Sequence, residues 1–261
     1  MKIGFFDSGL GGLTVMKAVV KHLPEYDYEF YGDTANLPYG DKTEEEIFEL
    51  TKAGMVHLFE KGCVLVIIAC NTASAETLRK LQDTFLVTSY PDRKILGVII
   101  PMVETVIEAL GQHALLLATK RTVESAKYEK EFEKMENRPT LRSIATAHLV
   151  PLIEAGKIEE AVHEAMAIID QNKELQYDSL VLGCTHYALL REGIEAKIDS
   201  SVKVFSADQV IPKKIKLYLD QHSEIETRLT RHSTRNVYLS VHTPHYDKIM
   251  SEILGGYLLS E

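Results

Sequence analysis

Little in this sequence favours a secreted, membrane-bound or nucleic-acid-binding protein. Only 3 cysteines occur among 261 residues, too few for a disulfide framework, which fits a reducing cytoplasm. The formal charge is −9 and basic residues form no cluster, so attraction to nucleic acid or anionic membranes is weak. No apolar stretch approaches the roughly 20 residues of a membrane span, and Asp7 interrupts the apolar N-terminal run, which argues against a signal peptide. We therefore expect a soluble, cytoplasmic protein with a small-molecule ligand and no nucleic-acid or membrane partner.

Several familiar site patterns are also missing. The cysteines form no close C-x-x-C pair, as a redox dithiol would, and have no further ligands at short spacing for zinc. The glycine-rich turn near the N-terminus has Thr14 where the dinucleotide fingerprint requires glycine. His242 and His245 form an H-x-x-H, but Pro244 between them argues against a metal site on a helix. We expect no bound metal and no nucleotide cofactor.

Short apolar runs alternate with longer segments of helical period, which is typical of parallel sheets with crossover helices. Several runs are apolar at consecutive positions, as expected for strands covered on both faces. The segment 43–62 has a Thr cap, an acidic first turn and a final glycine, and 156–171 has the same helical character. These patterns predict the α/β class with mainly parallel sheets. The expected strands are 2–6, 28–32, 64–69, 95–99, 114–118, 179–183 and 202–205, with 236–241 as a further candidate.

The length suits either one large domain or two of ordinary size, and we expect two α/β domains. Pro101 lies where a predicted strand gives way to a helix, which marks a boundary. We expect a first domain of residues 1–97 plus 207–261 and a second of residues 98–206. The sequence alone leaves open whether the C-terminal segment returns to the first domain.

Two cysteines stand in matching surroundings. Cys70 ends one apolar run and precedes Asn71, and Cys184 ends another and precedes Thr185 and His186. In a parallel sheet, ligands collect at the carboxyl ends of the strands, where a following helix N-terminus lowers the pKa of a thiol and binds carboxylates. A single cysteine at such a place is usually a small core residue, but two matching turns favour a functional pair.

Two thiols on opposite sides of one ligand suit the transfer of a proton from one face of a carbon to the other. One thiolate acts as general base and one thiol as general acid, and the roles exchange in the reverse direction. This pattern indicates a racemase or epimerase. A cysteine hydrolase or amidase is the alternative, with Cys184 and His186 as nucleophile and base and no role for the second cysteine. Cys63 precedes its strand without a polar neighbour and is expected to be structural.

Two further loops follow predicted strands and carry polar side chains. After the first strand, Asp7 and Ser8 begin a glycine-rich turn, and glycines there would let a ligand approach the backbone closely. After the second strand, the loop has Asp33 at its start and Tyr39 and Gly40 at its end. Helix capping in the first loop and a simple turn in the second are the alternatives, but both loops also suit an amino-acid ligand.

The motifs FDSGLGGLTV, YGDTANLPYG, ACNTASA and LGCTHY, in this order and spacing, resemble the glutamate racemase family. The resemblance covers nearly the whole chain and implies two pseudo-symmetric α/β domains with the active site at their interface. It also implies an isomerase that interconverts L- and D-glutamate without a cofactor and supplies D-glutamate for peptidoglycan, hence for the cell wall and cell shape. A pyridoxal enzyme would need a Schiff-base lysine, and no lysine here stands in a matching motif.

The resemblance implies roles for the residues of these motifs. Cys70 and Cys184 match the family's acid/base thiols, and Asp7 and His186 match its helpers of proton transfer. The implied substrate-binding positions are Asp7, Ser8, Tyr39, Gly40, Asn71, Thr72, Thr185 and His186. A homodimer is compatible with the resemblance, and no metal is implied.

Asp33 and Glu154 match acidic positions near the family's site. The chain departs from the usual pattern at Ile100, where many relatives have glutamate, at Ala188, a usual proline, and at Ala118, where glycine is common. The departures at Ile100 and Ala188 leave both thiols in place but keep open a catalytically weak amino-acid-binding homologue. Aspartate racemase, which has similar paired cysteines, is the other alternative, because the depth of a pocket is not readable from the sequence.

Overall fold

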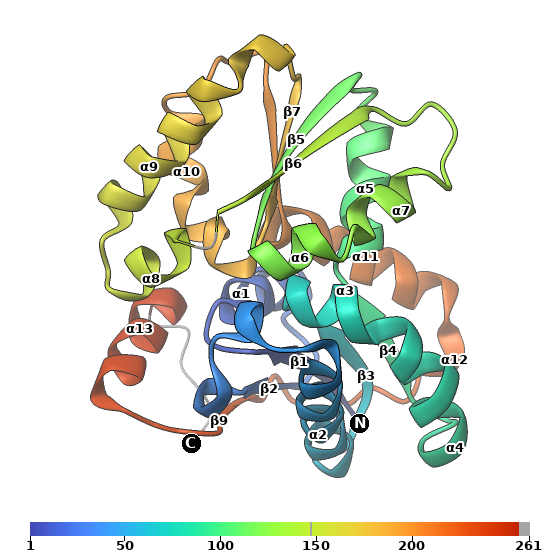
Figure 1. Ribbon diagram of the computed structural model, residues 1–261. Helices are drawn as coiled ribbons and strands as arrows, with labels where there is room; N and C mark the ends of the chain where they lie inside the picture. Colours follow the sequence, from blue (N-terminus) through green and yellow to red (C-terminus); the bar gives the residue numbers. More distant parts are fainter. Residues whose placement is uncertain (147, 256–261) are drawn as a thin grey trace.

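The computed structural model describes residues 1–146 and 148–255 and contains two β-sheets, called sheet A and sheet B (Figure 1). In spatial order, sheet A consists of β4 (Lys94–Gly97), β3 (Cys63–Ile68), β1 (Lys2–Asp7), β2 (Tyr28–Gly32) and β9 (Arg235–Leu239). Sheet B consists of β6 (Thr140–Ala145), β5 (His113–Ala118), β7 (Ser179–Gly183) and β8 (Lys203–Ser206). All neighbouring strands in both sheets are parallel. The expected α/β class with parallel sheets is confirmed.

Helices connect the strands and cover both sheets (Figure 1). They are α1 (Gly12–His22), α2 (Glu44–Glu60), α3 (Asn71–Lys80), α4 (Val87–Ser89), α5 (Ile99–Glu108), α6 (Lys120–Glu124), α7 (Lys127–Phe132), α8 (Leu149–Glu154), α9 (Ile158–Gln171), α10 (Arg191–Glu195), α11 (Ala207–Gln221), α12 (Ser223–Glu226) and α13 (Pro244–Leu254). Short 3₁₀ turns are Thr34–Asn36, Tyr39–Asp41, Lys173–Leu175 and Thr185–Leu190, and a π-helical segment, Leu81–Leu86, extends α3.

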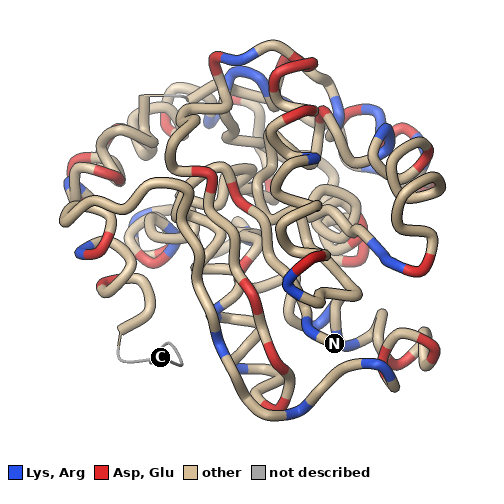
Figure 2. The backbone as a smooth tube through the Cα atoms, turned by 90° about the horizontal axis from the view of Figure 1, so that it is seen from below, with Lys and Arg blue, Asp and Glu red and all other residues tan. Residues whose placement is uncertain are grey.

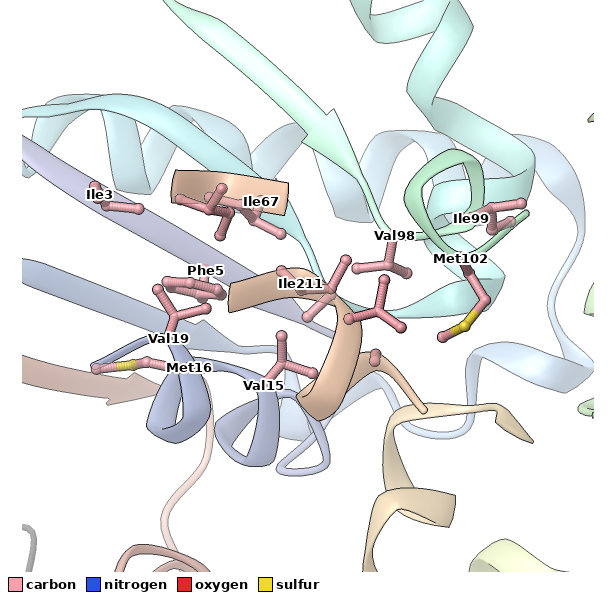
Figure 3. Close-up of a cluster of buried hydrophobic side chains, with 14 of the residues drawn as sticks. Ile3, Phe5, Val15, Met16, Val19, Ile67, Val98, Ile99, Met102 and Ile211 are labelled. Carbon is pink, nitrogen blue, oxygen red and sulfur yellow. The ribbon is translucent and has the colours of Figure 1, made fainter. Parts of the chain in front are cut away.

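Sheet A is buried on both faces. On one face, Phe5 of β1 lies in an apolar cluster with Val15 of α1 and Ile211 of α11 (Figure 3). On the other face, Phe6 of the same strand packs in a second cluster with Met55 of α2. Because successive side chains of a strand point to opposite faces, covering both faces requires apolar residues at consecutive positions. This explains the unbroken apolar runs of the sequence.

Sheet B is covered in the same way. Leu116 of β5 shares a cluster with Phe132 of α7, whereas Leu117 of the same strand shares a different cluster with Ile169 of α9 and Ile194 of α10. The first of these clusters also contains the core of sheet A around Phe5. The two sheets therefore share one continuous apolar core on that side.

All of the expected strands are present, with ends within two residues of those predicted. β9 pairs with β2, so the C-terminal segment completes sheet A. β6 was not expected. Its sequence, TLRSIA, has no apolar run, because it lies at the edge of sheet B with side chains that are exposed or half-buried.

Helix α2 also matches its predicted signals. Thr43 caps its first turn in a capping box with Glu46, and the chain turns after the helix at Gly62, whose φ is +86°. In the middle of the helix, Gly54 faces the ring of Phe6 so closely that a Cβ atom there would lie 2.5 Å from Cδ2 of that ring. Phe6 in turn contacts Tyr39 at a centroid distance of 6.4 Å. The packing of α2 thus supports the loop that carries Tyr39.

Charged side chains of both signs are spread over the chain (Figure 2). Blue and red segments alternate along the tube, and no large region of one sign dominates the view. Across residues 1–146 and 148–255, the structure has no helix with the length and apolar character required to cross a membrane.

We predict that Gly54→Ala lowers the free energy of unfolding by about 1–3 kcal/mol, since the added methyl group overpacks the fully buried Phe6 ring. Thermal and chemical unfolding would measure this change. Glu49→Ala, on the exposed side of the same helix, is the matched control and should change stability by about 0.5 kcal/mol or less. Equal stability of the two variants would contradict the packing described for α2.

Candidate active site

The predicted strand-end turns meet between the two sheets. Asp7 ends β1, Cys70 follows β3 as the N-cap of α3, and Cys184 follows β7 at the start of a 3₁₀ turn. Ligand sites of parallel sheets form at the carboxyl ends of strands, because the loops that leave these ends converge there. Here the loops of two sheets converge on one cavity.

The cavity has a volume of about 100 Å³. Of the residues predicted from the sequence, Ser8, Tyr39, Gly40, Cys70, Asn71, Thr72, Cys184, Thr185 and His186 line it. Three other predicted residues do not line the cavity, but each is hydrogen-bonded to a residue that does: Asp7, Asp33 and Glu154. Leu37, Pro38, Asp41, Thr119 and Val150 also line the cavity and were not singled out from the sequence.

Cys70 lies in a polar but enclosed pocket of the first sheet. Its Sγ atom is 3.4 Å from the hydroxyl of Ser8 and accepts a hydrogen bond from the backbone N–H of Ala73 at 3.5 Å. Burial raises the pKa of the Cys70 thiol to about 12, and the nearby carboxylate of Asp7 acts in the same direction. Cys70 is therefore protonated at neutral pH and is a proton donor in this state.

Cys184 has a different neighbour. Its Sγ atom is 3.8 Å from Nδ1 of His186, and Nε2 of the same ring is 3.2 Å from Oε1 of Glu154. Burial alone would lower the pKa of His186, but its hydrogen bonds to Cys184 and Glu154 raise it well above the usual value. The ring is thus an imidazolium at neutral pH, and this positive charge lies next to the Cys184 sulfur.

Asp7 is completely buried behind the cavity. It accepts hydrogen bonds from the backbone N–H of Gly9 at 3.1 Å and from the hydroxyl of Thr185 at 3.3 Å. Burial raises its pKa, while the positive charge of His186 partly opposes this effect. Asp7 therefore joins the turn after β1 to the turn after β7.

The loop that carries Tyr39 is held from the C-terminal part of the chain. The hydroxyl of Tyr39 donates to Asp33 at 2.7 Å, and the hydroxyl of Ser240 donates to the other oxygen of the same carboxylate at 3.0 Å. Ser240 also accepts from the backbone N–H of Ala35 at 2.8 Å. Asp33 thus connects Tyr39, in the cavity wall, to Ser240, in the segment after β9. These hydrogen bonds hold that part of the wall in place.

Three threonine hydroxyls connect helices that follow different sheets. Thr72 in α3 is 2.9 Å from Thr119 and 3.3 Å from Thr122, and the last two are 2.9 Å apart. Thr119 caps α6 directly after β5. Its position after an apolar strand is the same signal that identified Cys70, and it could have been used to find Thr119.

One glycine of the N-terminal glycine-rich turn lies against the turn that carries Cys184. A Cβ atom at Gly11 would lie 2.5 Å from Oγ1 of Thr185 and 2.9 Å from the backbone N of His186. Gly11 therefore allows close approach of the Cys184 turn, and a ligand contact at the glycine-rich turn stays a prediction. Among the described residues, no group of three or more His, Cys, Asp or Glu side chains is arranged to bind a metal ion.

Residues 10–211 match the family model for Asp/Glu/Hydantoin racemase. The glutamate racemase of Dinoroseobacter shibae is 33% identical over 238 residues, which cover 86% of each chain. Glutamate racemase of Roseobacter denitrificans is 35% identical, over 85% of this chain and 86% of that protein.

Solved structures agree with these relatives. A glutamate racemase of Bacillus anthracis superposes with a TM-score of 0.87 at 26% identity, covering 99% of this chain and 95% of that one. A glutamate racemase of Francisella tularensis, solved in complex with D-glutamate, has a TM-score of 0.83 at 26% identity, covering 97% and 93%. An aspartate racemase of Picrophilus torridus has a TM-score of 0.63 at 16% identity, covering 87% and 100%, and shares only the fold.

The contact between Glu154 and His186 gives a prediction about charge. Glu154→Gln removes the negative charge next to the imidazolium, so the pKa of His186 should fall. NMR titration of the imidazole resonances would measure it. Glu159→Gln, at an exposed position of α9, is the control and should leave the titration unchanged. An unaltered His186 titration in Glu154→Gln would show that this carboxylate does not sustain the charge.

Proposed function

The chain belongs to the Asp/Glu/Hydantoin racemase family, and from this membership we propose that it is a glutamate racemase, which interconverts L- and D-glutamate without a cofactor. The choice of glutamate over aspartate is supported by the curated relatives, which are glutamate racemases at 33–35% identity. The product D-glutamate would serve peptidoglycan synthesis in the cytoplasm. An amino-acid-binding homologue without turnover is not favoured, because both thiols and their neighbours are retained.

One observation carries the proposal: the thiols of Cys70 and Cys184 line the same cavity and come from different sheets. In one direction, the Cys184 thiolate takes the α-proton of a bound glutamate and becomes a thiol. The Cys70 thiol then gives its proton to the opposite face of the α-carbon and becomes a thiolate. The carbon regains four substituents with inverted configuration, and the reverse reaction exchanges the two roles.

The α-proton of an amino acid is a weak acid, so the developing carbanion needs stabilisation. Donors directed at the α-carboxylate supply it, since negative charge moves onto that group during proton removal. We assign this task to the side chain of Asn71 and to the hydroxyls of Ser8 and Thr72, which line the cavity. Thr185 lines the same cavity, but its hydroxyl donates to Asp7. The backbone of Tyr39 and Gly40 forms another wall of the cavity and suits the side-chain carboxylate.

Two features of the assembly belong to the same proposal. We assign residues 1–97 plus 207–261 to one domain and residues 98–206 to the other, so that each domain supplies one thiol to their interface. Residues 147 and 256–261 of these ranges lie outside the described residues. Changes in the contact between the domains would admit substrate and release product. Pairing of two chains as a homodimer is compatible with this arrangement and would be measured by light scattering.

The reaction is tested with L-glutamate in deuterated water, without added cofactor. Optical activity should vanish while deuterium enters the α-position, which NMR detects. Cys70→Ala and Cys184→Ala should each reduce racemisation by about 10³-fold or more, since each removes one acid/base group. Cys63→Ala, a buried cysteine away from the cavity, is the matched control and should keep the wild-type rate. Full activity of Cys184→Ala would rule out the two-thiol mechanism.

A single remaining thiol should still support part of the reaction. In each Cys→Ala variant, elimination from a glutamate with a leaving group on the β-carbon needs only one base. Retained elimination without racemisation would distinguish the loss of one proton-transfer group from the loss of folding.

The charged neighbours of the thiols should matter in both directions. His186→Asn removes the imidazolium beside Cys184, and Asp7→Asn removes the buried carboxylate behind Cys70. We expect kcat to fall by about tenfold or more in each variant, because the thiol–thiolate balance changes. Initial rates from L- and from D-glutamate measure the effect. If neither substitution lowered either rate, these residues would have no part in proton transfer.

A further inference from the structure

A buried hydrogen bond connects the cavity to a tyrosine that does not line it. Tyr128 lies in α7, on the side of sheet B, and only 1% of its surface is exposed. Its hydroxyl donates to Oδ1 of Asn71 at 2.8 Å. Asn71 begins α3, directly after Cys70. This contact therefore joins an element of sheet B to the turn that carries a thiol in sheet A.

The amide nitrogen of Asn71 lacks a hydrogen-bond partner among the described residues. Asn71 is only 3% exposed and lines the cavity, and within the described part of the chain its Nδ2 atom is buried without a hydrogen-bond partner. Leaving a buried N–H unpaired is costly, so native structures almost always satisfy such groups. A substrate carboxylate in the cavity would provide the missing acceptor.

The hydrogen bond from Tyr128 selects which end of the amide faces the cavity. A carboxamide turned by 180° would have nearly the same shape but would direct its oxygen at the substrate carboxylate, which repels it. Burial raises the pKa of Tyr128 far above its usual value, so the phenol remains protonated and continues to act as a donor. A donor at this place pairs with Oδ1 and leaves both N–H bonds of Nδ2 for the cavity.

We infer that Tyr128 is a positioning residue, which holds the Asn71 carboxamide with its N–H groups directed at a carboxylate of the bound substrate. The identity of this substrate as glutamate rests on the proposed function. The positioning itself rests on the hydrogen bond, the burial of both side chains and the unpaired Nδ2 atom. Because Tyr128 comes from the other side of the interface, the amide is fixed only when the two sides are in contact.

Tyr128→Phe tests the inference, because it removes only the hydroxyl. The freed amide can turn, so KM for glutamate should rise about tenfold and calorimetry should show D-glutamate binding weakened by the same factor. The value of kcat should fall as well, because the Asn71 amide also stabilises the developing carbanion. Tyr28→Phe is the matched control: Tyr28 is also fully buried and donates to a backbone carbonyl, that of Leu23, at 2.6 Å. It should keep the wild-type KM.

A double-mutant cycle separates positioning from general packing. In an Asn71→Ala background, Tyr128→Phe should have no further effect on D-glutamate binding, since there is no amide left to orient. An undiminished effect in that background, or equal KM values for Tyr128→Phe and Tyr28→Phe, would overturn the inference. Asn71→Asp provides a test if Tyr128→Phe does not fold. It keeps an acceptor for Tyr128 but removes the N–H groups, and unweakened D-glutamate binding by this variant would also overturn the inference.

These outcomes are distinct from failure of the proposed function. If the wild-type protein bound D-glutamate but did not racemise it, the proposed reaction would be wrong, while the binding measurements would still decide the role of Tyr128. If the wild-type protein racemised glutamate and Tyr128→Phe bound it normally, only the positioning role would be wrong.

Discussion

The site depends on the close approach of two backbone turns from different sheets. The turn after β1 packs so tightly on the turn after β7 that Gly11 has no room for a side chain beside Thr185 and His186. The buried Asp7 carboxylate joins the same turns by accepting the Thr185 hydroxyl. Burying a carboxylate is costly unless it accepts hydrogen bonds. Asp7 obtains the hydrogen bond from Thr185 only because the two turns meet, so the cavity beside it depends on the contact between the sheets. Any displacement of one sheet would expose or unpair this group.

The topology explains why one chain builds the same cysteine turn twice. In sheet A, the strand before Cys70 lies between β1 and β4; in sheet B, the strand before Cys184 lies between β5 and β8. The two strands therefore occupy equivalent places in equivalent arrangements, with β1 corresponding to β5. Thr119, which follows β5, stands where Ser8 stands near the end of β1. Two related halves facing each other place related side chains in one cavity, and the proposed inversion at a carbon needs one such group on each face of that carbon.

Local signals predicted much of this molecule, whereas contacts across the interface escaped prediction. Cys70 and Cys184 could be found because a buried strand followed by a polar turn is visible in a short stretch of sequence. Tyr128 could not be placed in the same way, because its partner Asn71 lies 57 residues away in the sequence and meets it only through packing. The glycine-rich turn was visible in the sequence, but the tight contact of Gly11 with Thr185 and His186 was not, because it depends on the other half of the molecule. β6 lacked an apolar run because it is an edge strand.

The different surroundings of the thiols have a kinetic consequence. Burial and Asp7 raise the pKa of the Cys70 thiol, whereas Cys184 lies beside the imidazolium of His186. In the proposed two-thiol mechanism, each turnover leaves the thiols in the opposite protonation state from the one in which it began. Because L- and D-glutamate have equal free energies in water, kcat/KM must be the same in both directions, whatever this asymmetry. The asymmetry of the thiols can therefore change only the separate values of kcat and KM for L- and D-glutamate, or the rate at which the free enzyme returns to its starting protonation state.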